Sequence, residues 1–325
     1  FVASVFSGMG VLVARFAGAG DRAKVNRTVY QAFLTAVFMA LGVLAPLGYF
    51  VAPAMLDMIN AAPEVQVEAL PYIRVMFVFS IGMLIFFMMS GALRSAGDAR
   101  TPLRLGVAMT VLNIVLNVVL IRGLGPIPAF GTLGAAMGTA IASGLTGAAF
   151  LWLLFSGRLV VHFTWTMSFA PDWRVIRELF RFGLPTGFQG IVMNIGGVLL
   201  LRFVGSLDYS AEAQAAYTVG YTELFALITF TSVGLMGATA AVAGQNLGAG
   251  RPERSRRAAM VAASIGVGVA SVVGLVFLVF PRALFMAFGM GDGVQFEIGR
   301  QLLAQLDKDQ EREKKKREKI YVQTL

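Results

Sequence analysis

Four amide side chains stand inside long apolar stretches of this chain, where polar groups are rare. Asn113 and Asn117 are four residues apart, so a helix would place them on one face. Gln189 and Asn194 occur in another apolar stretch, shortly after Pro185. An amide oxygen can coordinate Na⁺, and an amide group can hydrogen-bond a bound molecule. The alternative is structural, because amides also hydrogen-bond neighbouring membrane helices to each other.

One carboxyl group and two phenols form a second candidate set. Glu223 lies early in a further apolar stretch. An ionisable group inside a membrane is costly enough to suggest a function, here as a proton carrier. Glu223 could equally lie at the membrane surface, because its stretch starts only a few residues earlier. Tyr217 and Tyr221 could bind an organic cation through cation–π attraction, or could anchor the helix at the interface.

The stretches that carry these residues are long enough to cross a membrane. A bilayer core about 30 Å thick requires about 20 apolar residues of helix. The sequence is 57% hydrophobic and 14% charged, whereas a soluble domain carries roughly 25% charged residues. We therefore predict an all-α polytopic membrane protein. The eight expected spans are residues 1–19, 29–56, 69–93, 103–121, 133–155, 182–205, 217–243 and 258–280.

Two turns of the sequence resemble each other. Gly18-Ala19-Gly20 ends the first apolar stretch, Gly248-Ala249-Gly250 ends the seventh, and basic residues follow both turns. Six expected spans, the second to the seventh, lie between the turns, so both should face the same side of the membrane. This pattern predicts two helical lobes related as a parallel repeat. The positions that we interpret as hinge or close-packing points are Gly18, Gly20, Pro185, Gln245, Gly248 and Gly250.

The basic residues of the connections are distributed unevenly between the two sides. One side would carry Arg22, Lys24, Arg27, Arg94, Arg100, Arg104, Arg158, Arg174, Arg177, Arg181, Arg251, Arg254, Arg256 and Arg257. The other side would carry only Arg74, Arg122, Arg202 and Arg282. Because cytoplasmic loops of membrane proteins are enriched in lysine and arginine, we expect the first side to be cytoplasmic. The protein would then be a multi-pass protein of the inner (plasma) membrane.

The connections also predict a domain organisation. We expect an N-terminal lobe of five spans at 1–156, an interfacial linker at 157–177, a partial C-terminal lobe of three spans at 178–290 and a charged tail at 291–325. The linker carries Trp165 and Trp173, which are typical of a membrane interface. Its His162 could relay protons, but it lies outside the apolar spans and has no acidic residue near it in sequence.

Several classes of protein are excluded. The chain contains no cysteine, so it has no disulfide framework and no thiolate metal site. We find no phosphate-binding loop and no set of nucleophile and base, so we predict no enzyme activity and no catalytic residue. The formal net charge of +9 comes from short turns and the tail, which does not indicate a nucleic-acid partner. The sequence does not identify any residue as a metal ligand.

Six motifs in order resemble one known family, the multidrug and toxic compound extrusion (MATE) transporters. The motifs are VARFAGAGD (13–21), APEVQVEALPYIRV (62–75), GALRSAGDARTP (91–102), NIVLNVVLI with the following GLGPIPAFGTLGAAMGTAIA (113–142), FGLPTGFQ (182–189) and GQNLGAGRPERSRR (244–257). The resemblance covers about residues 1–300. It implies a fold of twelve helices in two six-helix lobes, of which this chain would supply the second helix to the ninth.

The resemblance also implies an activity. MATE transporters export organic cations or drugs in exchange for H⁺ or Na⁺ by alternating access, without a cofactor, and the expected protein would be a monomer in the lipid bilayer. The family's coupling carboxylates are described on its first, seventh and tenth helices. The stretch that matches the seventh helix contains Met193 and Asn194 and no acid, so no carboxylate is carried over.

Two other functions stay open at this stage. A flippase for lipid-linked precursors, from the same superfamily, would require a basic central cavity, and the expected spans hold almost no Arg or Lys. A truncated, non-transporting membrane fragment is the second alternative, because the first and last helices of the family's fold are missing.

Overall fold

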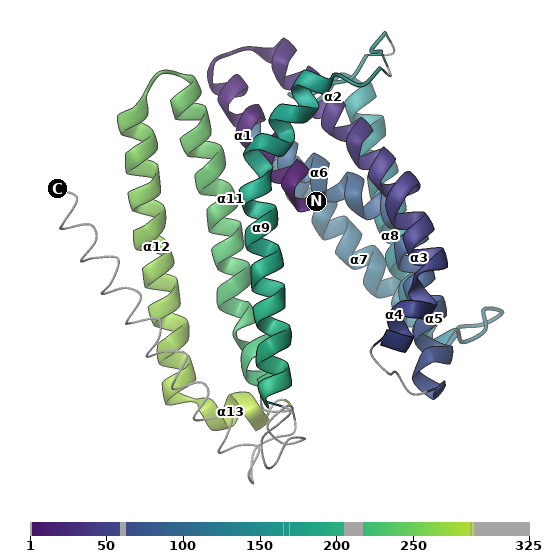
Figure 1. Cartoon of the computed structure of the whole chain (residues 1–325). Helices are drawn as coiled ribbons and strands as arrows, with labels where there is room; N and C mark the ends of the chain where they lie inside the picture. Colours follow the sequence, from purple (N-terminus) through teal and green to yellow (C-terminus); the bar gives the residue numbers. More distant parts are fainter. Residues whose placement is uncertain are drawn as a thin grey trace. The chain divides into compact units, whose positions relative to one another are not determined.

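The computed structural model describes residues 2–58, 63–164, 166–168, 170–204, 217–286 and 288, and these residues are almost entirely helical (Figure 1). The helices are α1 (Val2–Gly18), α2 (Arg22–Phe38), η1 (Met39–Leu44), α3 (Ala45–Phe50), α4 (Ala52–Met58), α5 (Pro63–Val78), α6 (Ser80–Ser95), α7 (Arg100–Arg122), α8 (Gly131–Phe155), α9 (Trp173–Val204), η2 (Thr218–Leu224), α11 (Ala226–Gly248), α12 (Pro252–Val279) and α13 (Pro281–Met286). The predicted tail at 291–325 lies outside the described residues.

The all-α membrane fold predicted from the sequence is confirmed. Helical structure coincides with each of the eight predicted spans. Within the described ranges, five helices are long and apolar enough to cross a membrane, or up to six if one bent pair is a single span. That bent pair is the third predicted span, where α5 and α6 meet at Phe79 with an angle of 50°. The predicted span at 69–93 therefore consists of two helices joined at a bend.

The second span contains a π-helical turn. The helix runs without interruption from Arg22 to Phe50, but η1 replaces regular α-helix directly before Pro46. Proline lacks the amide donor of an α-helix and its ring clashes with the preceding turn, so a wider turn at this position relieves the clash. The predicted span at 29–56 includes Pro46, but the sequence did not predict the π-helical turn.

Three helices end in the same turn. Gly20, Gly97 and Gly250 follow α1, α6 and α11 with φ angles of 76°, 102° and 69°. In each turn the glycine N–H binds the carbonyl three residues before it, and the next N–H binds the carbonyl five residues before it, at 2.8–3.1 Å. This is the Schellman geometry, in which glycine takes the left-handed conformation without steric cost. The two predicted Gly-Ala-Gly turns therefore share one structure, and a third turn at Gly97 has it too.

Two of the three helices that follow these turns, α2 and α7, start beside an aspartate that accepts hydrogen bonds from their first N–H groups. Asp21 accepts a hydrogen bond from the Lys24 N–H at 3.0 Å. Asp98 accepts from the N–H groups of Arg100 and Thr101, each at 3.0 Å. Such caps satisfy amide groups that a helix leaves unpaired at its first turn.

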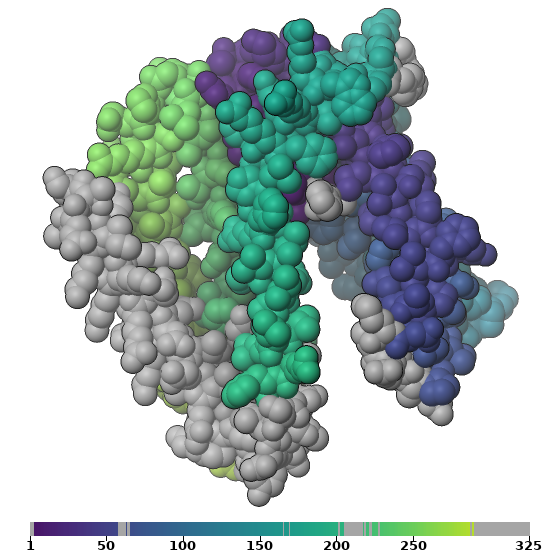
Figure 2. Space-filling model, in the orientation of Figure 1, coloured from purple at the N-terminus to yellow at the C-terminus, as the bar shows by residue number. Residues whose placement is uncertain are grey.

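Side chains of α2 hold the connection between α8 and α9, which runs from 156 to 172. The Asn26 amide accepts from the His162 N–H at 3.2 Å and lies 3.4 Å from His162 Nε2. Gln31 donates to the Ala170 carbonyl at 3.1 Å and accepts from the Asp172 N–H at 3.0 Å. Figure 2 shows the start of α9 (teal) beside the α1–α2 segment (purple) at this end. The described partner of His162 is an amide, not an acid.

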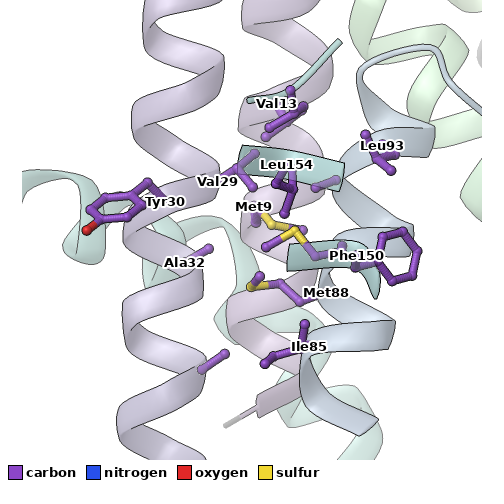
Figure 3. Packing of buried hydrophobic residues seen from close by; sticks show 14 of the residues in the cluster. Met9, Val13, Val29, Tyr30, Ala32, Ile85, Met88, Leu93, Phe150 and Leu154 are labelled. Atoms are coloured by element: carbon purple, nitrogen blue, oxygen red, sulfur yellow. The ribbon is translucent and has the colours of Figure 1, made fainter. Parts of the chain in front are cut away.

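The chain divides into two compact units, which we describe separately. The first comprises residues 1–188 and 240–255, and the second comprises 189–239 and 256–325. In the first unit, buried side chains of α1, α2, α6 and α8 converge, among them Met9, Val29, Met88 and Phe150 (Figure 3). The second unit has a smaller cluster around Leu224, Ile228, Phe277 and Phe285. The lobe boundaries that we expected from the sequence stay a prediction.

Helix α1 contacts α9 where side chains are small. A Cβ atom added to Gly8 would overlap the Leu179 carbonyl, and one added to Gly183 would overlap the Ser4 carbonyl. Gly187 lies against the Ser4 hydroxyl in the same way. Small residues let membrane helices approach to backbone contact, which increases packing attraction.

The two Gly-Ala-Gly segments pack against each other within the first unit. Gly18 lies against the carbonyl of Gln245, and Gly248 lies against the carbonyl of Arg15, so the two contacts are reciprocal. The Gln245 amide also donates to the Ser95 carbonyl at 2.8 Å. Helix ends from both copies of the repeat thus meet at the end of the unit that carries the basic turns. Any side chain at Gly18 or Gly248 would force these helices apart.

This contact can be tested with cysteines, since the native chain has none. A Cβ atom on Gly244 would lie 2.6 Å from the Ala14 Cβ, and a disulfide requires a Cβ separation of about 3.8 Å. We expect Ala14→Cys with Gly244→Cys to cross-link under mild oxidation after a small separation of the helices. Adding Gly248→Ala should reduce the cross-linked fraction severalfold, measured by gel mobility. The matched control Gly234→Ala, which meets nothing within 4 Å, should leave it unchanged; equal effects of both would contradict the reciprocal packing.

The attachment of the connection to α2 should depend on acid pH. Burial raises the pKa of Asp172, but hydrogen bonds from Arg27 and the Val175 N–H outweigh this and hold the pKa below its ordinary value. The stabilisation is therefore present above the unfolded pKa of about 4 and is lost as pH falls through the folded pKa. We expect the thermal unfolding midpoint to fall between about pH 5 and pH 3. Asp172→Asn should show a smaller fall over this range, and an identical fall would refute the attachment.

Candidate functional site

The best-formed polar cluster lies between α7 and α8 and contains the two predicted asparagines. Asn117 Nδ2 donates to Asn113 Oδ1 at 3.3 Å, which confirms that these residues share a helix face. Asn113 Nδ2 donates across the helix pair to Thr139 Oγ1 at 3.2 Å. Thr139 in turn donates to the Ala135 carbonyl of its own helix at 3.1 Å. The three side chains thus form one directed chain of hydrogen bonds.

This chain leaves one acceptor unused. Asn117 Oδ1 is buried and has no hydrogen-bond partner in the described part of the protein. It lies against Gly138 of α8, where a Cβ atom would overlap it. A buried polar atom without a partner costs about 1–3 kcal/mol, so such atoms commonly have a functional reason. Because Gly138 has no side chain, Asn117 Oδ1 can occupy this position.

Sequence reasoning missed Thr139. Its signal was the spacing of hydroxyl residues in the apolar stretch 131–155, where Thr139, Ser143 and Thr146 occur at positions i, i+4 and i+7. Ser143 and Thr146 donate to the carbonyls of Thr139 and Ala142 at 2.7 and 2.8 Å. They are satisfied within α8, so Thr139 is the one of these three hydroxyls that reaches α7.

The cluster offers neutral oxygen atoms and no titratable group. Asn113 Oδ1, Asn117 Oδ1 and Thr139 Oγ1 can coordinate an alkali cation or accept hydrogen bonds from a bound molecule. No acid or histidine occurs in α7 or α8. In the described ranges, no three His, Cys, Asp or Glu residues are grouped so that they could hold a metal ion.

The candidates on α9 are placed differently. Gln189 and Asn194 are both exposed in the second unit, and Asn194 donates to the Gly190 carbonyl of its own helix at 2.8 Å. Pro185 lies inside α9, where it leaves the carbonyl of the preceding turn without its helical donor. The structure does not join Gln189 and Asn194 by a hydrogen bond to one another.

The remaining candidates lie at the start of the seventh predicted span. Glu223 belongs to η2 and is exposed, and Tyr217 directly precedes η2 and is half-buried. The side chain of Tyr221 lies outside the described residues. Both interpretations of Glu223, as a proton carrier and as an interfacial residue, stay predictions. A hydrogen bond joins Asn113 and Asn117, two of the predicted residues.

Comparison with known proteins identifies a family. The MatE family model matches residues 1–119 and 185–303. The probable multidrug resistance protein NorM of Thermotoga maritima is 27% identical over 284 residues, which are 86% of this chain and 59% of that protein. A FAD transporter of Shewanella oneidensis is 24% identical over 266 residues, which are 79% of this chain and 56% of that protein. The chain therefore spans less than two thirds of the length of these relatives.

A solved structure has the same fold. The outward-facing structure of a multidrug resistance MATE family transporter of the MOP superfamily superposes with a TM-score of 0.80 at 21% identity. The superposition covers 93% of this chain and 66% of that chain. At this identity the likeness concerns the fold alone. Because the family model matches most of the sequence and the helical membrane fold agrees, this chain belongs to the MatE family of membrane transporters.

Proposed function

We propose that this chain is part of a secondary active antiporter that exports organic cations or drugs by alternating access. The family and the name of the Thermotoga maritima relative support export of drugs. The name of the Shewanella oneidensis relative indicates that substrates in this family also include a flavin nucleotide. The uneven distribution of basic residues supports the inner membrane, with the basic turns in the cytoplasm.

The observation that carries the proposal is the hydrogen-bond chain of Asn117, Asn113 and Thr139. In a bilayer, a polar cluster is costly unless it stabilises the helix pair or serves a ligand. Interhelical attachment alone needs the Asn113–Thr139 bond and leaves the buried Asn117 Oδ1 unexplained. A ligand that provides a positive charge or a donor would satisfy this oxygen. On this basis we assign the cluster of Asn117, Asn113 and Thr139 a role in the transport cycle.

Na⁺ fits this cluster better than H⁺ does. Exchange of a proton requires a group that titrates, and α7 and α8 contain no acid or histidine. Three neutral oxygens, completed by water, are ligands of the kind that hard cations prefer. The coupling ion bound here would accordingly be Na⁺.

A flippase for lipid-linked precursors is the second candidate, and the helix pair does not favour it. A pyrophosphate headgroup requires guanidinium or ammonium groups in the interior. The basic residues of α7 are Arg100, Arg104 and Arg122, near the two ends of the helix, and α8 has none. The middle of the pair presents amides and hydroxyls instead.

Asn117→Leu tests the proposed Na⁺ site, because leucine keeps a similar volume and removes the amide oxygen. We expect NaCl to raise the thermal unfolding midpoint of the unchanged protein relative to choline chloride. Asn117→Leu should weaken Na⁺ binding at least about tenfold, which corresponds to about 1.4 kcal/mol. The matched control is Asn194→Leu, since Asn194 is an exposed amide bound to its own helix. A full Na⁺ response in Asn117→Leu would rule out this cluster.

Gly138→Ala provides an independent test that leaves every polar group in place. The added methyl group would overlap Asn117 Oδ1, so the amide must rotate away. We expect the Na⁺-dependent rise of the unfolding midpoint to shrink as it does in Asn117→Leu. Gly144→Ala on the same helix, with nothing within 4 Å of the new methyl group, should keep the rise. If both variants respond to Na⁺ like the unchanged protein, the cluster has only a structural role.

A further inference from the structure

A cavity of about 670 Å³ lies between the start of α2, the end of the α8–α9 connection and the start of α9. Its lining includes Arg27, Tyr30, Met167, Trp173 and Arg174. All of these residues belong to the first unit. The segments that line it are coloured teal and purple and meet at one end of the unit in Figure 2. The cavity is distinct from the polar cluster of α7 and α8.

One of the two guanidinium groups that line this cavity, that of Arg174, is not paired with a described carboxylate. Asp172 forms an ion pair with Arg27 through Oδ2. Its Oδ1 accepts hydrogen bonds from two backbone N–H groups of α9. Both of its oxygens are therefore used. The Arg174 side chain is exposed and forms no hydrogen bond or ion pair with any residue that the structure describes. The Arg27 side chain stays 67% exposed despite its ion pair, so the cavity carries a net positive charge.

We expect this cavity to lie at the level of the lipid headgroups. Both α2 and α9 begin here and continue as helices that can cross a membrane. Trp173 is 73% exposed, and exposed tryptophan at a span end is typical of the interface. Further along α9, Phe182 and Leu184 are exposed apolar side chains. A ligand with a charged head and apolar chains would match this order of side chains.

We propose that this cavity binds the phosphate headgroup of an anionic phospholipid. Arg174 supplies the free guanidinium, and the exposed edge of Arg27 supplies a second donor. Basic pockets between membrane helices bind such headgroups, and guanidinium groups match phosphate oxygens geometrically. The bound lipid would connect α2 to α9 and stabilise the connection that Asn26 and Gln31 attach to α2. This inference rests on the membrane placement of the helices and is independent of the direction of transport.

The test measures binding of phosphatidylglycerol and phosphatidylcholine to the detergent-purified chain by native mass spectrometry. We expect selective binding of phosphatidylglycerol. Arg174→Gln should weaken that binding about fivefold, since a basic residue near a lipid surface contributes about 1 kcal/mol. The control is Arg251→Gln, which removes the same charge from an exposed residue of the α11–α12 turn. Its phosphatidylglycerol affinity should change less than about twofold.

Two additional arms keep the outcome decisive. Arg174→Lys retains the charge and should keep most of the preference for phosphatidylglycerol, which separates loss of charge from misfolding. Inorganic phosphate should compete poorly, because it lacks the apolar chains. The site would be overturned if Arg174→Gln and Arg251→Gln lost equal affinity for phosphatidylglycerol. It would also be overturned if the chain bound phosphatidylglycerol no better than phosphatidylcholine. Competition by inorganic phosphate as strong as by the lipid would overturn the assignment to a lipid.

Discussion

The close approach of backbones along α1 is the constraint on which the first unit depends. Ser4 and Gly8 meet α9 there, and Gly18 meets the end of α11, each through contact with a main-chain carbonyl. Lipid tails are as apolar as the side chains that they would replace, so helices in a membrane associate through packing and hydrogen bonds. A larger residue at these positions would remove the contact, not merely weaken it. Helix α1 therefore holds the first part of α9 in place, whereas Asp172 binds the N–H groups at the start of α9.

The same principle produces the polar cluster. Gly134 and Gly138 of α8 lie against the Leu120 carbonyl and the Asn117 amide of α7. At this separation Asn113 can reach Thr139 directly, whereas a larger residue at Gly138 would exclude the Asn117 oxygen. Packing and chemistry are thus one feature of the helix pair. The close approach of α7 and α8 explains how the buried Asn117 oxygen fits within an apolar span. The proposed Na⁺ site depends on this approach.

The sequence predicted what depends on periodicity and missed what depends on contacts between distant residues. Apolar stretches predicted the helices, and the spacing of Asn113 and Asn117 predicted their common face. The repeat predicted that its two turns lie on one side, but not that Gly18 and Gly248 pack reciprocally. The partners of Thr139 and Ser95 on other helices became visible only in the structure. Glu223, which the sequence placed either inside the membrane or at its surface, is exposed within η2.

The measurement that tests the central claim most directly is coupled flux in proteoliposomes that contain this chain. Efflux of an organic cation such as ethidium and entry of radioactive Na⁺ would be recorded together, under an imposed Na⁺ gradient and then under a pH gradient alone. The account predicts efflux that requires the Na⁺ gradient and is accompanied by Na⁺ entry, with both fluxes lost when Asn117 is replaced by leucine. Efflux driven equally well by a pH gradient in the absence of Na⁺, or unaffected by that substitution, would contradict it.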